Sequence, residues 1–162
     1  MRQLFSSLTM PFTSLTAIAI RRTTTNQKDL FSGKIDVGYE VVVADDQNRT
    51  AAFFHRGYGL DELVEPLLDV MVAHVASRLE AAHAAGQAIV WAPGVTLDQS
   101  LLRIASKQHD VRLDDAEVRL QVVNGTAELC RRDEQLTTLR IDGPNFEPVR
   151  KLLGRLSAWR VG

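Results

Sequence analysis

Hydrophobic residues recur at helical spacing over one long stretch in the middle of the chain. From Leu60 to Ala85 they follow steps of three and four, the period of one face of an α-helix. Further apolar residues widen the face, so we expect much of this helix to be buried. The predicted buried face consists of Leu63, Leu67, Val70, Met71, Val75, Leu79 and Ala82, widened by Val64, Leu68, Val72 and Ala76.

Residues at both ends of this stretch suit a helix. Asp61 and Glu62 lie at the start, where carboxylates interact favourably with the helix dipole. Gly86 follows the last alanines and is a good helix stop. Pro66 lacks an N–H and costs roughly 3 kcal/mol beyond the first turn. We therefore expect the helix either to begin near Glu65 or to kink at the proline.

Alternating and β-branched residues predict three strands before this helix. They cover Ser14–Thr24, Lys34–Ala44 and Thr50–Arg56. The turn residues Asp45–Asn48 join the last two strands into a hairpin. The polar stretch Thr25–Gly33 predicts a loop.

After the helix, the pattern predicts a short strand and a second helix. Ala88–Ala92 is an apolar run suited to a buried strand, and Pro93-Gly94 ends it. Thr96 or Asp98 can cap the second helix. Its apolar side would contain Leu97, Leu101, Leu102, Ile104 and Ala105. The acidic stretch Asp110–Ala116 predicts a loop.

The last third of the chain predicts three strands and a terminal helix. Glu117–Val123 and Thr126–Arg132 flank Asn124-Gly125, a strong hairpin signal, and Leu136–Asp142 is a further strand. The terminal helix is expected over Phe146–Val161. Its apolar face contains Phe146, Val149, Leu152, Leu153, Leu156 and Trp159.

This order of elements predicts an α/β (α+β) fold. We expect one domain over residues 1–162, with a mixed, largely antiparallel sheet of about six to seven strands. The long central helix, the second helix and the amphipathic C-terminal helix would pack on it.

The hairpin from Gly38 to Arg56, the long helix and a strand running into another helix resemble the element order of the ribonuclease-H-like fold. The resemblance implies carboxylates on the first strand, the first helix and the fourth strand, which hold divalent metal ions in that family. The first strand here has no acidic residue, Ala92-Pro93-Gly94 stands where an Asp is required, and only Glu62 or Glu65 could serve on the helix. The resemblance therefore implies the fold without the metal chemistry.

Composition narrows the class of protein. The 162 residues are 45% hydrophobic with a formal net charge of −1, so no global feature points to nucleic acid or an anionic membrane. The single cysteine, Cys130, excludes an internal disulfide and suits a reducing compartment. No apolar run approaches the roughly 20 residues that cross a bilayer. We expect a small, soluble, cytoplasmic protein.

The first 28 residues contain no acidic side chain, a composition that overlaps with mitochondrial transit peptides. We interpret Leu15–Arg22 instead as the first strand of the domain.

Candidate catalytic and metal-binding residues are scattered. The chain contains a single ExxH pair, Glu80 and His83, and no HExxH or paired cysteines. We therefore expect no metal, no cofactor and no catalytic residues. The glycine break Gly57–Gly59 lacks the third glycine and the lysine of a phosphate loop. The alternative is a small enzyme with a pocket near this break, formed by His55, Tyr58 and Glu62.

Charge is separated by element. The central helix is mainly acidic and the terminal helix mainly basic. One interpretation is that the two face each other. The other is that the terminal helix binds a partner through Arg150, Lys151, Arg155, Trp159 and Arg160.

These observations predict a non-enzymatic binding protein, an adaptor, regulator or inhibitor, that acts through protein–protein contacts. One alternative is the small enzyme near Gly57–Gly59. Another is a nucleic-acid-binding domain that uses the basic C-terminal helix. The partner would be another protein, with nucleic acid and a homo-oligomer left open and a membrane excluded.

Overall fold

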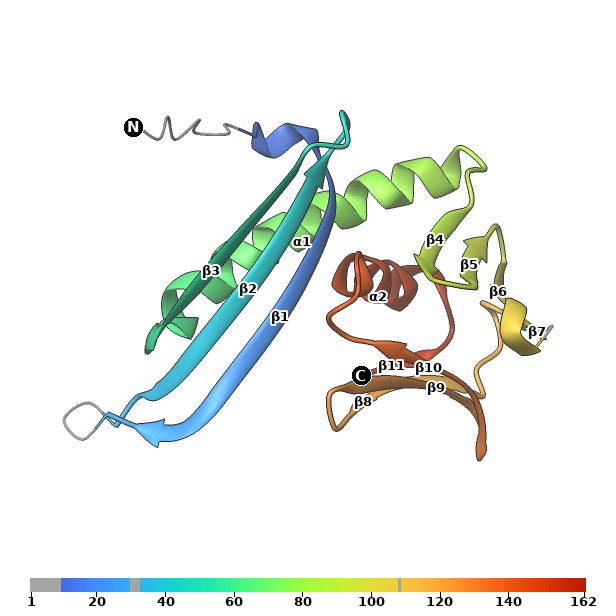
Figure 1. The fold of residues 1–162 in the computed structure, drawn as a ribbon. Coiled ribbons are helices and arrows are strands. Elements are labelled where there is room, and N and C mark those ends of the chain that lie inside the picture. Colours follow the sequence, from blue (N-terminus) through green and yellow to red (C-terminus); the bar gives the residue numbers. More distant parts are fainter. Residues whose placement is uncertain (1–9, 30–32, 108) are drawn as a thin grey trace.

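The computed structural model describes residues 10–29, 33–107 and 109–162, and it confirms the α+β class. These residues contain two α-helices and eleven strands, and the strands form three mostly antiparallel sheets (Figure 1). The strands are thus divided among one three-stranded and two four-stranded sheets rather than gathered in one. Residues 1–9 of the acid-free N-terminus lie outside the described part.

The first sheet is an antiparallel meander with one long helix across it (Figure 1). It consists of β1 (Leu15–Lys28), β2 (Ile35–Asp45) and β3 (Thr50–Tyr58), followed by α1 (Asp61–Ala84). The three predicted strands and their hairpin are confirmed. β1 continues to Lys28, into the stretch where a loop was expected, and residues 30–32 of that stretch lie outside the description.

Helix α1 begins at Asp61 and contains Pro66, so the prediction that it begins near Glu65 is wrong. Its buried face is also narrower than predicted. The buried residues are Leu68, Met71, Val72, Val75 and Ala76. Leu63, Leu67 and Val70, which were predicted to be buried, are exposed, because a single three-stranded sheet covers only one face of the helix.

The prediction of a second helix is wrong, because the residues assigned to it form strands of a sheet. The four antiparallel strands are β4 (Ile89–Ala92), β5 (Val95–Asp98), β6 (Leu101–Ile104) and β7 (His109–Arg112). Gln99 has a φ of 49°, which turns the chain between β5 and β6. Every second residue is then buried, namely Val95 and Leu97 on one strand and Leu102 and Ile104 on the next. β7 also occupies part of the stretch predicted as an acidic loop.

The third sheet has the order β10-β9-β8-β11. Its strands are β8 (Val118–Val123), β9 (Thr126–Arg131), β10 (Glu134–Arg140) and β11 (Arg160–Val161), the last parallel to β8. The Asn124-Gly125 hairpin is confirmed, with φ of 49° and 79°. Helix α2 (Phe146–Leu156) is shorter than predicted, because the chain leaves the helix after Leu156 and adds β11 to the sheet.

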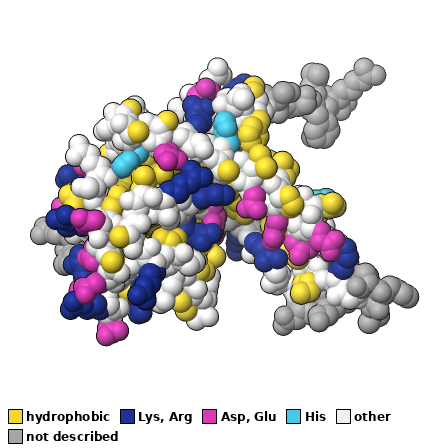
Figure 2. All heavy atoms as spheres, turned by 180° about the vertical axis from the view of Figure 1, so that it is seen from behind, with side chains coloured by type: hydrophobic (Ala, Val, Ile, Leu, Met, Phe, Trp, Pro, Cys, Tyr) yellow, Lys and Arg dark blue, Asp and Glu magenta, His cyan; other side chains and the backbone are white. Residues whose placement is uncertain are grey.

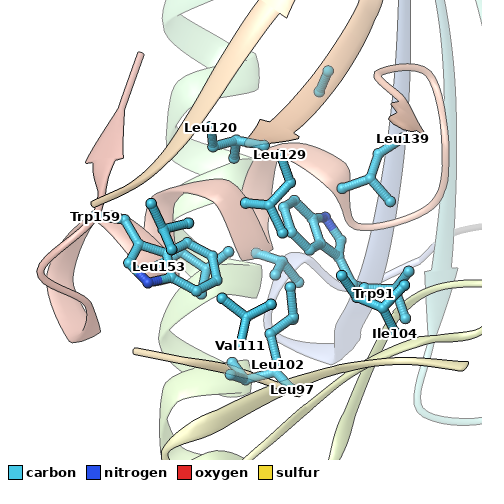
Figure 3. Packing of buried hydrophobic residues seen from close by; sticks show 14 of the residues in the cluster. Trp91, Leu97, Leu102, Ile104, Val111, Leu120, Leu129, Leu139, Leu153 and Trp159 are labelled. Atoms are coloured by element: carbon cyan, nitrogen blue, oxygen red, sulfur yellow. The ribbon is translucent and has the colours of Figure 1, made fainter. Parts of the chain in front are cut away.

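Two hydrophobic cores result. The first lies between the β1–β3 sheet and α1. The second is shared by α2 and both four-stranded sheets, and Figure 3 shows Trp91 and Trp159 within it, together with Leu153 of α2. Leu79 near the end of α1 packs against both cores.

Polar contacts also join the two parts. Arg155 of α2 donates a hydrogen bond to Glu80 of α1 at 2.8 Å. Asn145 binds the backbone of Ile18 twice, with its N–H donating at 2.8 Å and its side-chain oxygen accepting at 3.1 Å. The outer edge of β1 is therefore attached to the C-terminal part at Ile18. That the chain folds as one domain stays a prediction.

Two further sequence expectations bear on the whole chain. Cys130 is buried and forms no disulfide. Within the ranges that the structure describes, no helix is long and apolar enough to cross a bilayer.

Candidate functional site

Large hydrophobic side chains are exposed on β3 and on the adjoining α1. We call this region the β3–α1 surface, and it consists of Phe53, Phe54, Tyr58, Leu63, Leu67 and Val70. Leu63 is 77% exposed and Phe54 67%. Such residues are ordinary when they are scattered, but six of them on two consecutive elements indicate a candidate interaction site.

The register of the first sheet places the two phenylalanines on opposite faces. Phe53 pairs with Val41, which is buried beneath α1, so Phe53 lies on the helix-covered face. Phe54 pairs with the exposed Glu40 and lies on the other face. β3 therefore presents an aromatic side chain on each face of the sheet.

The exposed residues of α1 lie on the flank that is nearer to β3. At about 100° per residue, Leu63, Leu67 and Val70 share one flank, and Glu65 and Asp69 lie on the opposite one. Glu65 pairs with Arg22 of β1 at 3.3 Å, so the acidic flank faces β1. Figure 2 shows hydrophobic side chains beside a row of acidic ones along the arm formed by the first sheet and α1.

β3 is also an open edge strand. Among the described residues it pairs with β2 alone, and β2 lies between β1 and β3. The outward N–H and C=O groups of an edge strand can pair with a strand of another chain. The β3–α1 surface thus combines an open strand edge with exposed apolar side chains on both sides of it.

The predicted pocket residues near the glycine break are not brought together. His55 pairs with the buried Tyr39 and so lies on the helix-covered face, whereas Tyr58 pairs with Asp36 and lies on the other face. Glu62 accepts a hydrogen bond from Lys34 at 2.8 Å. The break itself begins later than predicted, because β3 runs to Tyr58. An enzyme site here stays a prediction that this geometry does not favour.

Trp159, predicted to contact a partner, is only 6% exposed, and its indole N–H donates to the Arg112 carbonyl at 2.9 Å. The indole is part of the second core, so it is not available to a partner at the surface.

The four basic residues predicted with it are distributed over separate sites. Arg150 pairs with Glu147 on its own helix, and Arg155 pairs with Glu80 of α1. Lys151 is exposed on α2, and Arg160 is exposed on β11. The Arg155 pair confirms that the acidic and basic helices face each other at this point. A partner for the four basic residues stays a prediction.

A cleft of about 710 Å³ lies between the first sheet, α1, α2, the β8–β9 turn and the adjoining ends of β9 and β10. Its charged residues are largely paired with each other. Arg22 lies 3.3 Å from Glu65, and Arg140 and Asp142 form a second pair. Tyr39 donates to Glu65 at 2.8 Å, and burial together with this bond raises the pKa of Tyr39 to about 12. Because these charged side chains are paired with one another, few of them are free to bind a charged ligand. We therefore interpret the cleft as part of the junction between the two cores.

A second hollow of about 450 Å³ lies where β4 approaches β10. Trp91 and Phe146 line it and stack with ring centroids 5.8 Å apart. The indole nitrogen of Trp91 is buried without a hydrogen-bond partner in the described structure. A buried unpaired donor costs about 1–3 kcal/mol, so this position is a local weak point of the second core.

In the described ranges, no group of three or more His, Cys, Asp or Glu side chains could hold a metal ion. Comparison with protein families, curated proteins and solved structures finds no match for this chain. The ribonuclease-H-like element order is not continued either, because β4 is followed by a strand rather than by a helix.

Sequence reasoning assigned the helix part of the β3–α1 surface to the core. Two signals could have identified it. The apolar residues of α1 cover more of its circumference than one sheet can bury. Phe53 and Phe54 are consecutive in a strand, so one of them must lie on the face away from the helix.

Proposed function

We propose that this chain is a non-enzymatic binding protein that acts through protein–protein contacts, and that the β3–α1 surface makes the contact. The observation that carries the proposal is the coincidence of an open strand edge with six exposed large hydrophobic side chains. Edge-strand addition supplies main-chain hydrogen bonds, and apolar side chains beside the strand add affinity and specificity.

The charge near this surface suits a protein partner. The acidic flank of α1 is turned toward β1, where Arg22 contacts both Asp61 and Glu65. The opposite flank therefore presents apolar side chains without a row of carboxylates. Hydrophobic anchors surrounded by polar residues are typical of protein interfaces.

Site-specific photo-crosslinking tests the proposal. A photoreactive amino acid would replace Phe54, and the matched control would carry it at Val90, an equally exposed hydrophobic residue on β4. A third chain would carry it at Lys151 on α2. We expect polypeptide crosslinks in cells from position 54 and few from position 90, detected as shifted bands and identified by mass spectrometry.

Two results would contradict the proposal. Crosslinks from position 151 but not from position 54 would favour the basic helix as the binding site. Equal yields from positions 54 and 90 would show that the β3–α1 surface makes no specific contact.

A further inference from the structure

We propose that the partner at the β3–α1 surface is a second copy of this chain. The two copies would pair β3 with β3 in antiparallel fashion about a two-fold axis at Phe54. The result is a continuous six-stranded sheet with both α1 helices on the same face. This inference rests on the proposed function and specifies its partner.

The two outer strands of the first sheet differ in how free their edges are. The outer edge of β1 is attached to the C-terminal part, because Asn145 both donates to and accepts from the Ile18 backbone. β3 has no strand on its outer side among the described residues. The outer edge of β1 is thus blocked at Ile18, whereas the described outer edge of β3 carries no such attachment, which favours sheet extension from β3.

The surface is symmetric about its own centre, as a two-fold interface requires. Phe54 is the midpoint of β3, which spans Thr50–Tyr58. On α1, Leu67 lies between Leu63 and Val70. His55 pairs with Tyr39, and Tyr39 donates to Glu65, so the middle of β3 lies level with this part of α1.

Pairing about Phe54 brings compatible side chains together. Phe54 of one copy would lie opposite Phe54 of the other, Phe53 opposite His55, and Ala52 opposite Arg56. No like charges face each other, and each larger polar residue meets a small or aromatic one. Aromatic pairs across antiparallel strands are among the stabilising cross-strand contacts.

The flank of α1 on the β3 side adds no charge repulsion to this pairing. It carries Leu63, Leu67 and Val70, and the acidic residues Glu65 and Asp69 lie on the other flank.

The area is sufficient for a specific dimer. From the exposed fractions, and with about 200 Å² for a whole aromatic side chain, the six side chains expose roughly 600 Å² per copy. Complete coverage of these side chains in both copies would bury about 1,200 Å², the lower end of the range for specific interfaces, and this value is an upper bound for the six residues. Backbone and neighbouring atoms would add to this value.

Sedimentation equilibrium of the purified full chain tests the state of assembly. We expect a mass near twice 18.0 kDa that falls toward the monomer on dilution. Phe54→Lys and Leu67→Lys should each weaken the dimer at least about thirtyfold, as expected for the loss of a central interface residue. Val90→Lys makes the same change at an exposed hydrophobic residue of β4 and should leave the dimer unchanged. Circular dichroism would verify that each variant is folded.

A cysteine crosslink tests the geometry. The natural Cys130 is buried, so Phe54→Cys introduces an exposed thiol at the proposed axis. Directly opposed residues have Cβ atoms about 4.5–5.5 Å apart, near the range that a disulfide spans. Mild oxidation should therefore link two Phe54→Cys chains within the dimer, whereas Val90→Cys chains should stay unlinked.

The outcomes separate this inference from the proposed function. A chain that is monomeric at all concentrations, yet still crosslinks to another protein from position 54, would overturn the dimer and leave the proposed function intact. A monomer without crosslinks from position 54 would overturn both. A dimer that survives Phe54→Lys and Leu67→Lys would show that assembly uses a different surface.

Discussion

Asp36 shows how one residue holds the edge of the first sheet. Asp36 lies on the middle strand, β2, and is largely buried. Its carboxylate accepts hydrogen bonds from Arg56 of β3 at 2.7 Å and from Thr25 of β1 at 3.3 Å. A single side chain thus connects all three strands. The bond from Arg56 outweighs the effect of burial and holds the pKa of Asp36 below its ordinary value of 3.8.

Replacement of Asp36 by Asn should produce a pH-dependent loss of stability. Because the pKa of Asp36 is lower in the folded than in the unfolded chain, its contribution is present above about pH 3.8 and disappears as the pH falls through the folded value. Asp36→Asn should unfold at lower urea than the wild type at pH 7, and the two curves should converge below pH 3.8.

The control for this comparison is Asp69→Asn, an exposed carboxylate on α1, which should change the urea midpoint little. A gap between Asp36→Asn and the wild type that stays constant from pH 7 to pH 3 would argue against the ion pair as its cause.

At the scale of elements, local signals predicted some parts well and others not. Alternation predicted β1, β2 and β3, and Asn124-Gly125 predicted the β8–β9 hairpin, because turn chemistry acts over two to four residues. The stretch from Leu97 to Ile104 predicts a helix wrongly, because its leucines and isoleucine satisfy the helical and the strand period equally. Gln99, which turns the chain there, is not a typical residue for a left-handed turn.

The candidate site could not be predicted from periodicity. The spacing of Leu63, Leu67 and Val70 shows that they share a face, but burial depends on how much sheet is available to cover that face. The partition of strands into three sheets is set by contacts distant in sequence. Sequence reasoning therefore identified the apolar face of α1 but not the part of it that stays exposed.

Pro66 makes α1 a target for stabilisation. It lies in the sixth position of the helix, beyond the first turn, where it removes one backbone hydrogen bond. Its side chain is exposed, so Pro66→Ala loses little packing. We expect the free energy of unfolding in urea to rise by about 1–3 kcal/mol.

Ser77→Ala, at another exposed position of α1, provides the control and should change stability by less than about 0.5 kcal/mol. If Pro66→Ala also changed the free energy of unfolding by less than about 0.5 kcal/mol, the helix would accommodate the proline without a cost in stability.

At the scale of the whole molecule, Asn145 is one of the residues that connect the two parts of the chain, beside Leu79 and the Arg155–Glu80 pair. It adopts a left-handed backbone with a φ of 58°, which Asn tolerates better than most residues. Its side chain makes no capping hydrogen bond to α2 but accepts one from the backbone N–H of Ile18. Asn145 therefore occupies the position directly before α2 and also attaches the C-terminal part of the chain to β1.

Two substitutions separate these roles. Asn145→Ala should destabilise the chain by about 2 kcal/mol, since it loses the side-chain hydrogen bond and since alanine tolerates a left-handed backbone less well than asparagine. Asn145→Gly should cost about 1 kcal/mol, because glycine accepts that conformation and only the bond is lost. The free energy of unfolding in urea checks both values. An equal decrease in the two variants would rule out a contribution from the backbone conformation. No decrease in either variant would show that the hydrogen bond between Asn145 and Ile18 does not stabilise the chain.

The attachment of β1 by Asn145 has a consequence for synthesis on the ribosome. The first core is built from residues up to Leu79, whereas Asn145 is made near the end of the chain. At roughly 5–20 residues per second, several seconds separate the two. During that interval the nascent meander lacks the attachment at Ile18, so the start of β1 is open as well as β3 and can join a strand of a neighbouring nascent chain. Slow translation between Leu79 and Asn145 should therefore increase misassembly, and it should do so through β1 rather than β3.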